Sequence, residues 1–198
     1  MKKSSLFRIA LMSYLHPRQA MDILAKQESP LYGAVYVLLR GVCLSLFLYL
    51  PFFILKFEPI TPAYLALFDT PNYFLYAALM WPLFGLLSWL FVSASSYLIL
   101  RLLRYPVNFD QLLNVGGLLN LIIGIVIILS DWVMVALGLH TNANFLGITH
   151  LVIADPWAIA LTSIFYKKYF RVPVWLSILL GLLTRILYFP LAWIFIRT

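Results

Sequence analysis

Residues 112–137 read LLNVGGLLNLIIGIVIILSDWVMVAL, an apolar run with a single charged side chain. The hydrocarbon core of a bilayer is about 30 Å thick and a helix rises about 1.5 Å per residue, so about 20 apolar residues are enough to cross it. Four further runs of this kind occupy residues 31–55, 73–100, 146–166 and 173–195. Because backbone amides inside lipid must bond to one another, each run is expected to be helical. The sequence therefore predicts an all-α membrane protein, a bundle of five transmembrane helices.

The composition leaves little room for a soluble domain. Apolar residues make up 64% of the chain and charged residues 11%, whereas an ordinary soluble domain is about 25% charged. We expect a cytoplasmic or interfacial amphipathic segment over residues 1–30 and a five-span transmembrane domain over residues 31–198. The single cysteine, Cys43, cannot form an intramolecular disulfide and gives no indication of the compartment.

The basic residues are divided unevenly between the two ends of the predicted spans. Ten of the 14 lie on the side of the N-terminus, and they are Lys2, Lys3, Arg8, Arg18, Lys26, Arg101, Arg104, Lys167, Lys168 and Arg171. Lys56 and Arg197 fall on the other side, and Arg40 and Arg185 lie inside spans. The positive-inside rule then predicts a cytoplasmic N-terminus and an outside C-terminus. The same bias supports the more polar run 146–166 as a span. The excess of basic residues, which gives the chain a net charge of +7, is expected to face anionic lipid headgroups rather than nucleic acid.

The N-terminal segment has the pattern of a short amphipathic helix lying on the membrane surface. Residues 4–15 mix basic and apolar side chains, and Pro17 fits the first position of a helix. Arg18, Asp22 and Lys26 then repeat every four residues, a spacing that suits ion pairs on one helical face. No A-x-A-like cleavage site follows, so a signal peptide is not expected.

Four charged side chains fall inside the predicted spans, and they are Arg40, Asp131, Asp155 and Arg185. A charge at the bilayer centre costs from about 3 to more than about 10 kcal/mol, so these residues either form a polar site or ion path, pair internally, or extend to the interface. Asp155 and Arg185 are expected at matched depths, roughly 17 and 18 Å from the cytoplasmic ends of two adjacent antiparallel spans. We therefore predict an ion pair between them, direct or through one intervening polar group.

Small and polar side chains repeat along one face of the third predicted span, at Asn114, Gly117, Asn120 and Gly124. Their spacings of three and four residues place them on the same side of a helix. Such a face allows another helix to approach closely and to form interhelical hydrogen bonds. Helix packing is therefore the preferred interpretation of this face, with ligand binding as the alternative.

Motifs typical of catalysis or of metal binding do not occur in the sequence. There is no H-E-x-x-H, no G-x-S-x-G and no P-loop. His16, His140 and His150 are far apart and lack metal-ligand spacing. Asp131 and Asp155 do not stand in the G-x-G-D context of an intramembrane aspartyl dyad. We therefore expect neither enzymatic activity nor a cofactor nor a bound metal.

Several segments together resemble the Yip family of Ypt/Rab-interacting membrane proteins. Residues 15–30, LHPRQAMDILAKQESP, are similar to the short helix before the first span of its small bacterial members, and residues 31–33, LYG, to part of the D-L-Y-G-P motif of eukaryotic members. Residues 97–129 resemble the basic loop and glycine-containing third span of the family, and residues 155–157, DPW, its fourth span. The resemblance implies five spans, a cytoplasmic N-terminus and a bacterial inner membrane.

Two functions are compatible with these observations. The first is a non-enzymatic scaffold or membrane-organising factor that acts through its basic cytoplasmic face, either with a membrane-protein partner or with a second copy of itself. The alternative is a small transporter or channel subunit that uses the buried charges Arg40, Asp155 and Arg185. A transporter needs a hydrated path to these charges, whereas a scaffold needs them paired and dry.

Overall fold

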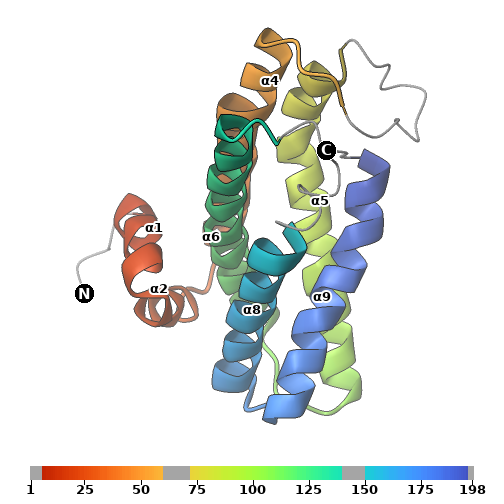
Figure 1. Cartoon of the computed structure of the whole chain (residues 1–198). Coiled ribbons are helices and arrows are strands. Elements are labelled where there is room, and N and C mark those ends of the chain that lie inside the picture. The colour runs from red at the N-terminus through yellow and green to blue at the C-terminus, as the bar shows by residue number, and fades with distance from the viewer. Residues whose placement is uncertain (1–5, 60–71, 140–149, 196–198) are drawn as a thin grey trace.

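The computed structural model describes residues 6–59, 72–139 and 150–195, and within these ranges every regular element is a helix (Figure 1). The elements are α1 (Leu6–Leu15), α2 (Pro17–Leu24), α3 (Leu31–Leu44), the π-helical segment η1 (Ser45–Tyr49), α4 (Leu50–Ile54), α5 (Tyr73–Leu102), α6 (Phe109–Ala136), the π-helical segment η3 (His150–Ala154), α8 (Asp155–Phe170) and α9 (Val174–Phe195).

Among the described residues, three helical runs are long and apolar enough to cross a membrane: Leu31–Ile54, which joins α3 to α4, then α5 and α6. Their ends lie close to those predicted from the sequence. The start of the predicted span 146–166 falls outside the described residues, and the helix that follows continues past residue 166 to Phe170. Helix α9 closely matches the predicted run 173–195.

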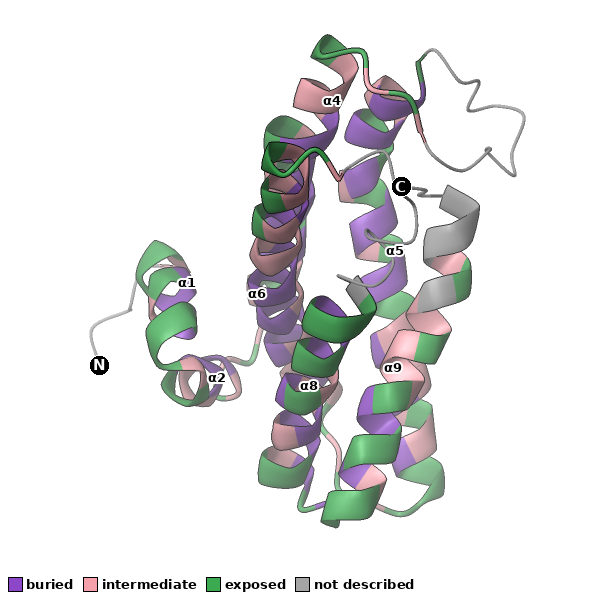
Figure 2. Cartoon of the chain, viewed as in Figure 1, coloured by how far each residue is buried: buried purple, intermediate pink, exposed green. Residues whose placement is uncertain are grey.

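Helices α3, α5 and α6 pack together, and α8 and α9 form an antiparallel pair beside them (Figure 1). Buried residues face the space between the helices, whereas exposed residues cover their outer surfaces (Figure 2). Many of the exposed residues are large and apolar, among them Leu46, Leu83, Leu129, Leu151 and Ile186. An outer surface of this kind is suited to lipid rather than to water.

Glycines bring α3 into direct backbone contact with two other helices. A Cβ atom on Gly117 of α6 would lie 2.3 Å from the carbonyl oxygen of Gly33, and one on Gly33 would lie 2.2 Å from that of Leu113. Farther along α3, a Cβ atom on Gly41 would lie 2.7 Å from the Cα atom of Pro82 in α5. A methyl group has no room at these crossings, so both depend on glycine.

Two prolines leave backbone carbonyls without a helical partner, and side chains of other helices bond to them. Pro82 cannot donate to the carbonyl four residues earlier in α5, and the Ser45 hydroxyl donates to that carbonyl instead. Pro51 cannot donate to the carbonyl of Phe47, which accepts a hydrogen bond of 2.6 Å from Nε1 of Trp132 in α6. Ser45 and Phe47 both belong to η1, where the helix is already irregular.

The N-terminal segment is a corner of two helices that docks on the bundle. Helix α1 ends at Leu15, and Pro17 begins α2. Ile9, Met21 and Leu24 are at most 1% exposed and belong to the same apolar core as buried residues of α6 and α8. The sequence pattern predicted the amphipathic character but not this docking, because periodicity identifies an apolar face without identifying what covers it.

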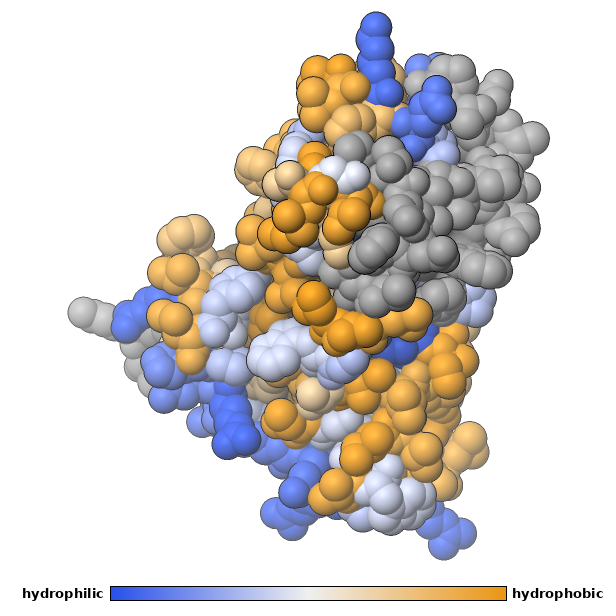
Figure 3. Space-filling view, viewed as in Figure 1, coloured by the Kyte–Doolittle hydropathy of each residue, from blue (hydrophilic) through white to orange (hydrophobic). Residues whose placement is uncertain are grey.

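The opposite face of α1 remains apolar and uncovered. Phe7, Leu11 and Leu15, spaced four residues apart, are 78%, 59% and 73% exposed. The hydroxyl of Tyr36 donates to the carbonyl of Leu6 at 3.0 Å and holds α1 against α3. Figure 3 shows hydrophobic atoms on the upper side of this region and hydrophilic atoms along the lower left edge of the molecule. This separation is typical of a helix at a lipid–water interface.

Asp22 joins α2 to the end of α8. Its carboxylate accepts hydrogen bonds of 2.7 Å from the Lys168 ammonium and of 2.7 Å from the Tyr169 hydroxyl. Partial burial raises the pKa of Asp22, but these two bonds together with the positive charges of Lys168 and Lys26 outweigh it and hold the pKa below its usual value. Burial and the bond to Asp22 together raise the pKa of Tyr169. The four-residue spacing of Arg18, Asp22 and Lys26 had suggested an ion pair within one helix. The pair that Asp22 forms instead joins α2 to α8.

Candidate functional site

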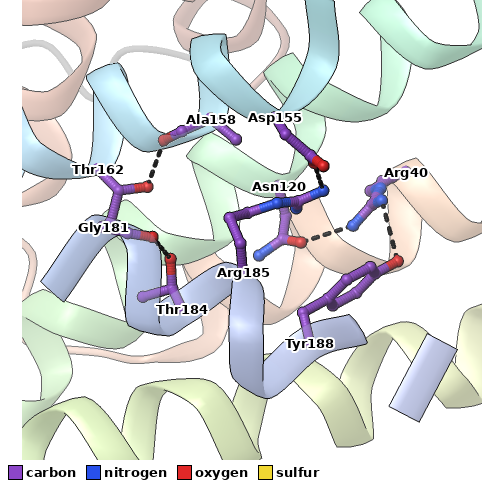
Figure 4. A network of polar contacts seen from close by, with 9 residues as sticks. All are labelled: Arg40, Asn120, Asp155, Ala158, Thr162, Gly181, Thr184, Arg185 and Tyr188. Carbon is purple, nitrogen blue, oxygen red and sulfur yellow. Dashed lines mark hydrogen bonds and ion pairs between the residues drawn. The ribbon is translucent and has the colours of Figure 1, made fainter. Parts of the chain in front are cut away.

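An ion pair in the interior of the bundle joins α8 to α9. The Nη2 atom of Arg185 donates directly to Oδ1 of Asp155 (Figure 4). The two side chains are only 20% and 12% exposed. The predicted ion pair between these adjacent antiparallel helices is confirmed, without an intervening group. A pair buried to this degree satisfies both charges, and removal of either partner would strand the other.

Arg40 of α3 reaches the same interior region and is 3% exposed. Its Nη1 donates to Oδ1 of Asn120 in α6 at 2.6 Å, and its Nη2 lies 3.5 Å from the hydroxyl of Tyr188 in α9. Its guanidinium also lies 5.1 Å from the centre of the Trp81 ring in α5. Among the described residues, no carboxylate pairs with Arg40. Neither an ion pair nor extension to the interface accommodates this charge, because an amide and aromatic rings surround it instead.

Tyr188 connects the two guanidinium groups. Its ring centre lies 5.1 Å from the Arg185 guanidinium carbon and 5.9 Å from that of Arg40. Arg40, Asn120, Asp155, Arg185 and Tyr188 thus form one set of contacts across α3, α6, α8 and α9, here termed the central network (Figure 4). Sequence reasoning missed Tyr188, although it follows Arg185 by three residues and so shares its helical face.

The face predicted on α6 lies against α3. The amide of Asn114 accepts a hydrogen bond of 3.0 Å from the backbone N–H of Gly33, and a Cβ atom on Gly124 would lie 2.5 Å from Cγ of Arg40. Together with the Gly117 crossing and the Asn120 bond, these contacts confirm a packing face. The face also holds the Arg40 side chain in place, which the packing interpretation did not include.

A cavity of about 80 Å³ lies beside the central network, between α5, α6, α8 and α9. Most of its lining is apolar, but it includes the polar side chains Ser88, Ser93, Ser96, Asn120, Thr162 and Arg185. A water molecule needs at least about 10–15 Å³ of this kind of volume and two to four polar partners, so the cavity has room and partners for several waters. The Asp155–Arg185 pair therefore lies beside a space that contains polar groups, here termed the central cavity.

Two buried guanidinium nitrogens in this region have no hydrogen-bond partner. They are Nε of Arg40 and Nε of Arg185. Arg185 lines the central cavity, whereas Arg40 borders it through Asn120. A charged donor buried without an acceptor is unfavourable, so an acceptor within the cavity would stabilise the site.

Asp131, the fourth predicted intramembrane charge, is buried at 3% exposure on α6. It follows Gly124 by seven residues, which places it about 10 Å farther along the helix axis than the part of α6 that contacts Arg40. Asp131 is not one of the five residues of the central network, to which Asp155 belongs.

Within residues 6–59, 72–139 and 150–195, no group of three or more His, Cys, Asp or Glu side chains is arranged to hold a metal ion. His140 lies outside these ranges. What the central network and cavity can do chemically is to bind a small polar or charged species next to fixed positive charge. No protein-family model, no curated protein sequence and no solved structure matches this chain.

Proposed function

We propose that the chain crosses a bacterial inner membrane five times, with its N-terminus in the cytoplasm and its C-terminus outside. The three long apolar runs support the first three crossings. Helices α8 and α9 support the last two, because they are joined by a short turn and expose apolar side chains such as Trp157 and Leu182. Arg101, Arg104 and Lys167 would then lie on the cytoplasmic side with the N-terminal helices.

Reporter fusions test this topology. A reporter that is active only in the cytoplasm should work when fused after Arg104 and should be silent when fused after Thr198. A reporter fused after Lys56 is the matched control and should also be silent. Activity of the Thr198 fusion would overturn the five-span arrangement, and the run His150–Phe170 would then be the first candidate for a helix that does not cross.

As its function, we propose a non-enzymatic role in organising the membrane at the basic cytoplasmic face. The observation that carries this proposal is the docking of α1 and α2. The bundle holds both helices in place, while Phe7, Leu11 and Leu15 remain uncovered beside exposed basic residues. A helix fixed in this way would insert its apolar face among lipid chains and gather anionic headgroups around the cations. The resemblance to the Yip family is compatible with this role.

Reconstitution into vesicles tests the lipid preference. Energy transfer from the native tryptophans to a dansyl-labelled phosphatidylglycerol should exceed transfer to a dansyl-labelled phosphatidylcholine, and the excess should fall as salt is added. The variant Arg101→Gln/Lys167→Gln should reduce the excess, whereas the control Lys56→Gln on the other side should not. Equal transfer to both lipids in the wild type would contradict the proposal.

The alternative, a small transporter or channel subunit, is favoured by one observation, the central cavity with its polar groups beside the Asp155–Arg185 pair.

The access of water to the central cavity separates the two functions. In a Cys43→Ala background, Thr162→Cys in the cavity should react with a membrane-impermeant thiol reagent if the cavity is open to water. Ser177→Cys, at a 1% exposed position away from the cavity, is the dry control. Labelling of neither variant in vesicles would exclude the transporter.

A further inference from the structure

The central network carries more positive than negative charge. It contains the guanidinium groups of Arg40 and Arg185 but only one carboxylate, that of Asp155. Arginine remains protonated in proteins, so the positive charge of Arg40 cannot be removed by loss of a proton. In a low-dielectric interior, an uncompensated cation attracts an anion strongly and repels other cations. Asp131, the other buried carboxylate named above, lies about 10 Å farther along α6 than the part that contacts Arg40 and outside the central network, so the local charge balance favours a ligand with a negative charge.

Hydrogen-bond donors are also available where such a ligand would lie. Nε of Arg185 is buried without a partner, and Arg185 lines the central cavity. The Tyr188 hydroxyl, which also lines it, accepts a hydrogen bond from Arg40 and can donate its own proton. The hydroxyls of Thr162 and Thr184 instead donate to carbonyls of their own helices at 2.7 Å. Their remaining lone pairs suit waters that hydrate the ligand.

Those threonine lone pairs would also suit a small cation, so the charges must decide between the two kinds of ion. Two guanidinium groups against one carboxylate oppose a cation, and the unpartnered Nε–H of Arg185 requires an acceptor. An anion satisfies both conditions. The volume of about 80 Å³ has room for roughly five water-sized groups, which limits the ligand to about five non-hydrogen atoms.

We propose that the central cavity is a binding site for a small monovalent anion of the size of a halide, nitrate or bicarbonate ion, held by Arg185 and Tyr188 and attracted by the charge of Arg40. The site does not depend on transport, because a bound anion would equally complete the charge balance of a static scaffold. It accounts for two features that the ion pair alone leaves unexplained, the excess positive charge and the orphaned Arg185 Nε.

Thermal unfolding in detergent tests the site. The purified full-length protein is transferred into sodium gluconate, whose anion is too large for the cavity, and sodium nitrate is then exchanged in at constant ionic strength. A ligand that binds only the folded state raises the melting temperature in a saturable manner, and the midpoint gives its affinity. Wild-type protein should show this saturable rise. The control Arg101→Gln, which removes a cation outside the cavity, should give the same curve.

Two variants should shift the nitrate affinity in opposite directions. Asp155→Asn removes the only carboxylate of the central network and should tighten nitrate binding at least about fivefold. Arg40→Gln removes the excess charge and should weaken it by a similar factor. Both variants leave a buried group without its partner, so if neither folds, the presence or absence of a saturable nitrate response in the wild type decides. A linear response to nitrate in the wild type, or unchanged affinity in Asp155→Asn, would overturn the proposal, and neither result bears on the lipid preference or the topology.

Discussion

Alanine in place of either partner of the Asp155–Arg185 pair should destabilise the protein strongly. Breaking a buried ion pair by removing one partner costs about 3–5 kcal/mol, because the other charge stays buried without compensation. The two side chains retain exposures of 12% and 20%, so values near the lower end of that range are expected. The double variant Asp155→Ala/Arg185→Ala leaves neither charge stranded and should recover about 0.5–3 kcal/mol relative to the sum of the single effects.

The two single variants should respond differently to pH. In Arg185→Ala the stranded carboxylate of Asp155 can take up a proton. For an ordinary aspartate, protonation at pH 7 costs about 4 kcal/mol, and this cost falls by about 1.4 kcal/mol for each unit by which the pH is lowered. The deficit of this variant is therefore limited by that cost and should shrink as the pH falls. In Asp155→Ala the guanidinium cannot lose its proton, so its deficit should not show this decrease.

Unfolding by dodecyl sulfate in mixed micelles, followed at several pH values, measures all of these free energies. Asp110→Ala is a matched control, because it removes an aspartate of the first turn of α6 that lies outside the central network. Its cost should be about 0.3–1 kcal/mol, the effect of an acidic residue at a helix N-terminus. Strict additivity of the Asp155 and Arg185 effects, or a deficit of Arg185→Ala that does not change with pH, would refute the argument.

Three further outcomes follow from the packing. Gly117→Val should cost at least about 1–3 kcal/mol in the same unfolding assay, since its Cβ would collide with the backbone of α3. Arg104→Gly should stabilise the protein by about 0.5–1 kcal/mol, because Arg104 follows the end of α5 with a φ of 61°, which glycine adopts without strain. The control Arg101→Gly, inside that helix, should destabilise the protein by about 1 kcal/mol. The pKa of Asp22 is lowered in the folded state, so its carboxylate should contribute stability at neutral pH that is lost as the pH falls below about 4. The melting temperatures of the wild type and of Asp22→Asn should therefore converge below that pH. Curves that stay parallel over the whole pH range would contradict the pairing with Lys168.

The positions of the helices could be predicted from the sequence because hydrocarbon thickness imposes their length, and apolar runs mark them directly. The Asp155–Arg185 pair could be predicted for a related reason, since a short connection between two spans fixes their relative depth. The spacing of Gly117 and its neighbours on α6 similarly identified the face that packs on α3. Each of these inferences uses only regular helix geometry, either the rise per residue along the axis or the angle between successive residues around it.

Other features depend on which helix faces which, and the sequence contains no direct signal for that. The docking of α1 through Ile9 and of α2 through Met21 is a tertiary contact between segments distant in the chain. The partners of Arg40 come from α6 and α9, and the central cavity arises from the packing of four helices. The π-helical segment Ser45–Tyr49 has no composition that distinguishes it from the α-helix around it.

The bonds that Ser45 and Trp132 make to proline-freed carbonyls have a mechanical consequence. A proline inside a helix usually creates a hinge, because the missing hydrogen bond lets the two halves bend independently. Here the open carbonyl before Pro82 is tied to η1, and the open carbonyl of Phe47 is tied to α6. A change of angle at Pro82 would therefore either break the Ser45 bond or carry η1 along, and a movement of η1 would either break the Trp132 bond or carry α6 along, so these two bonds couple the three helices mechanically.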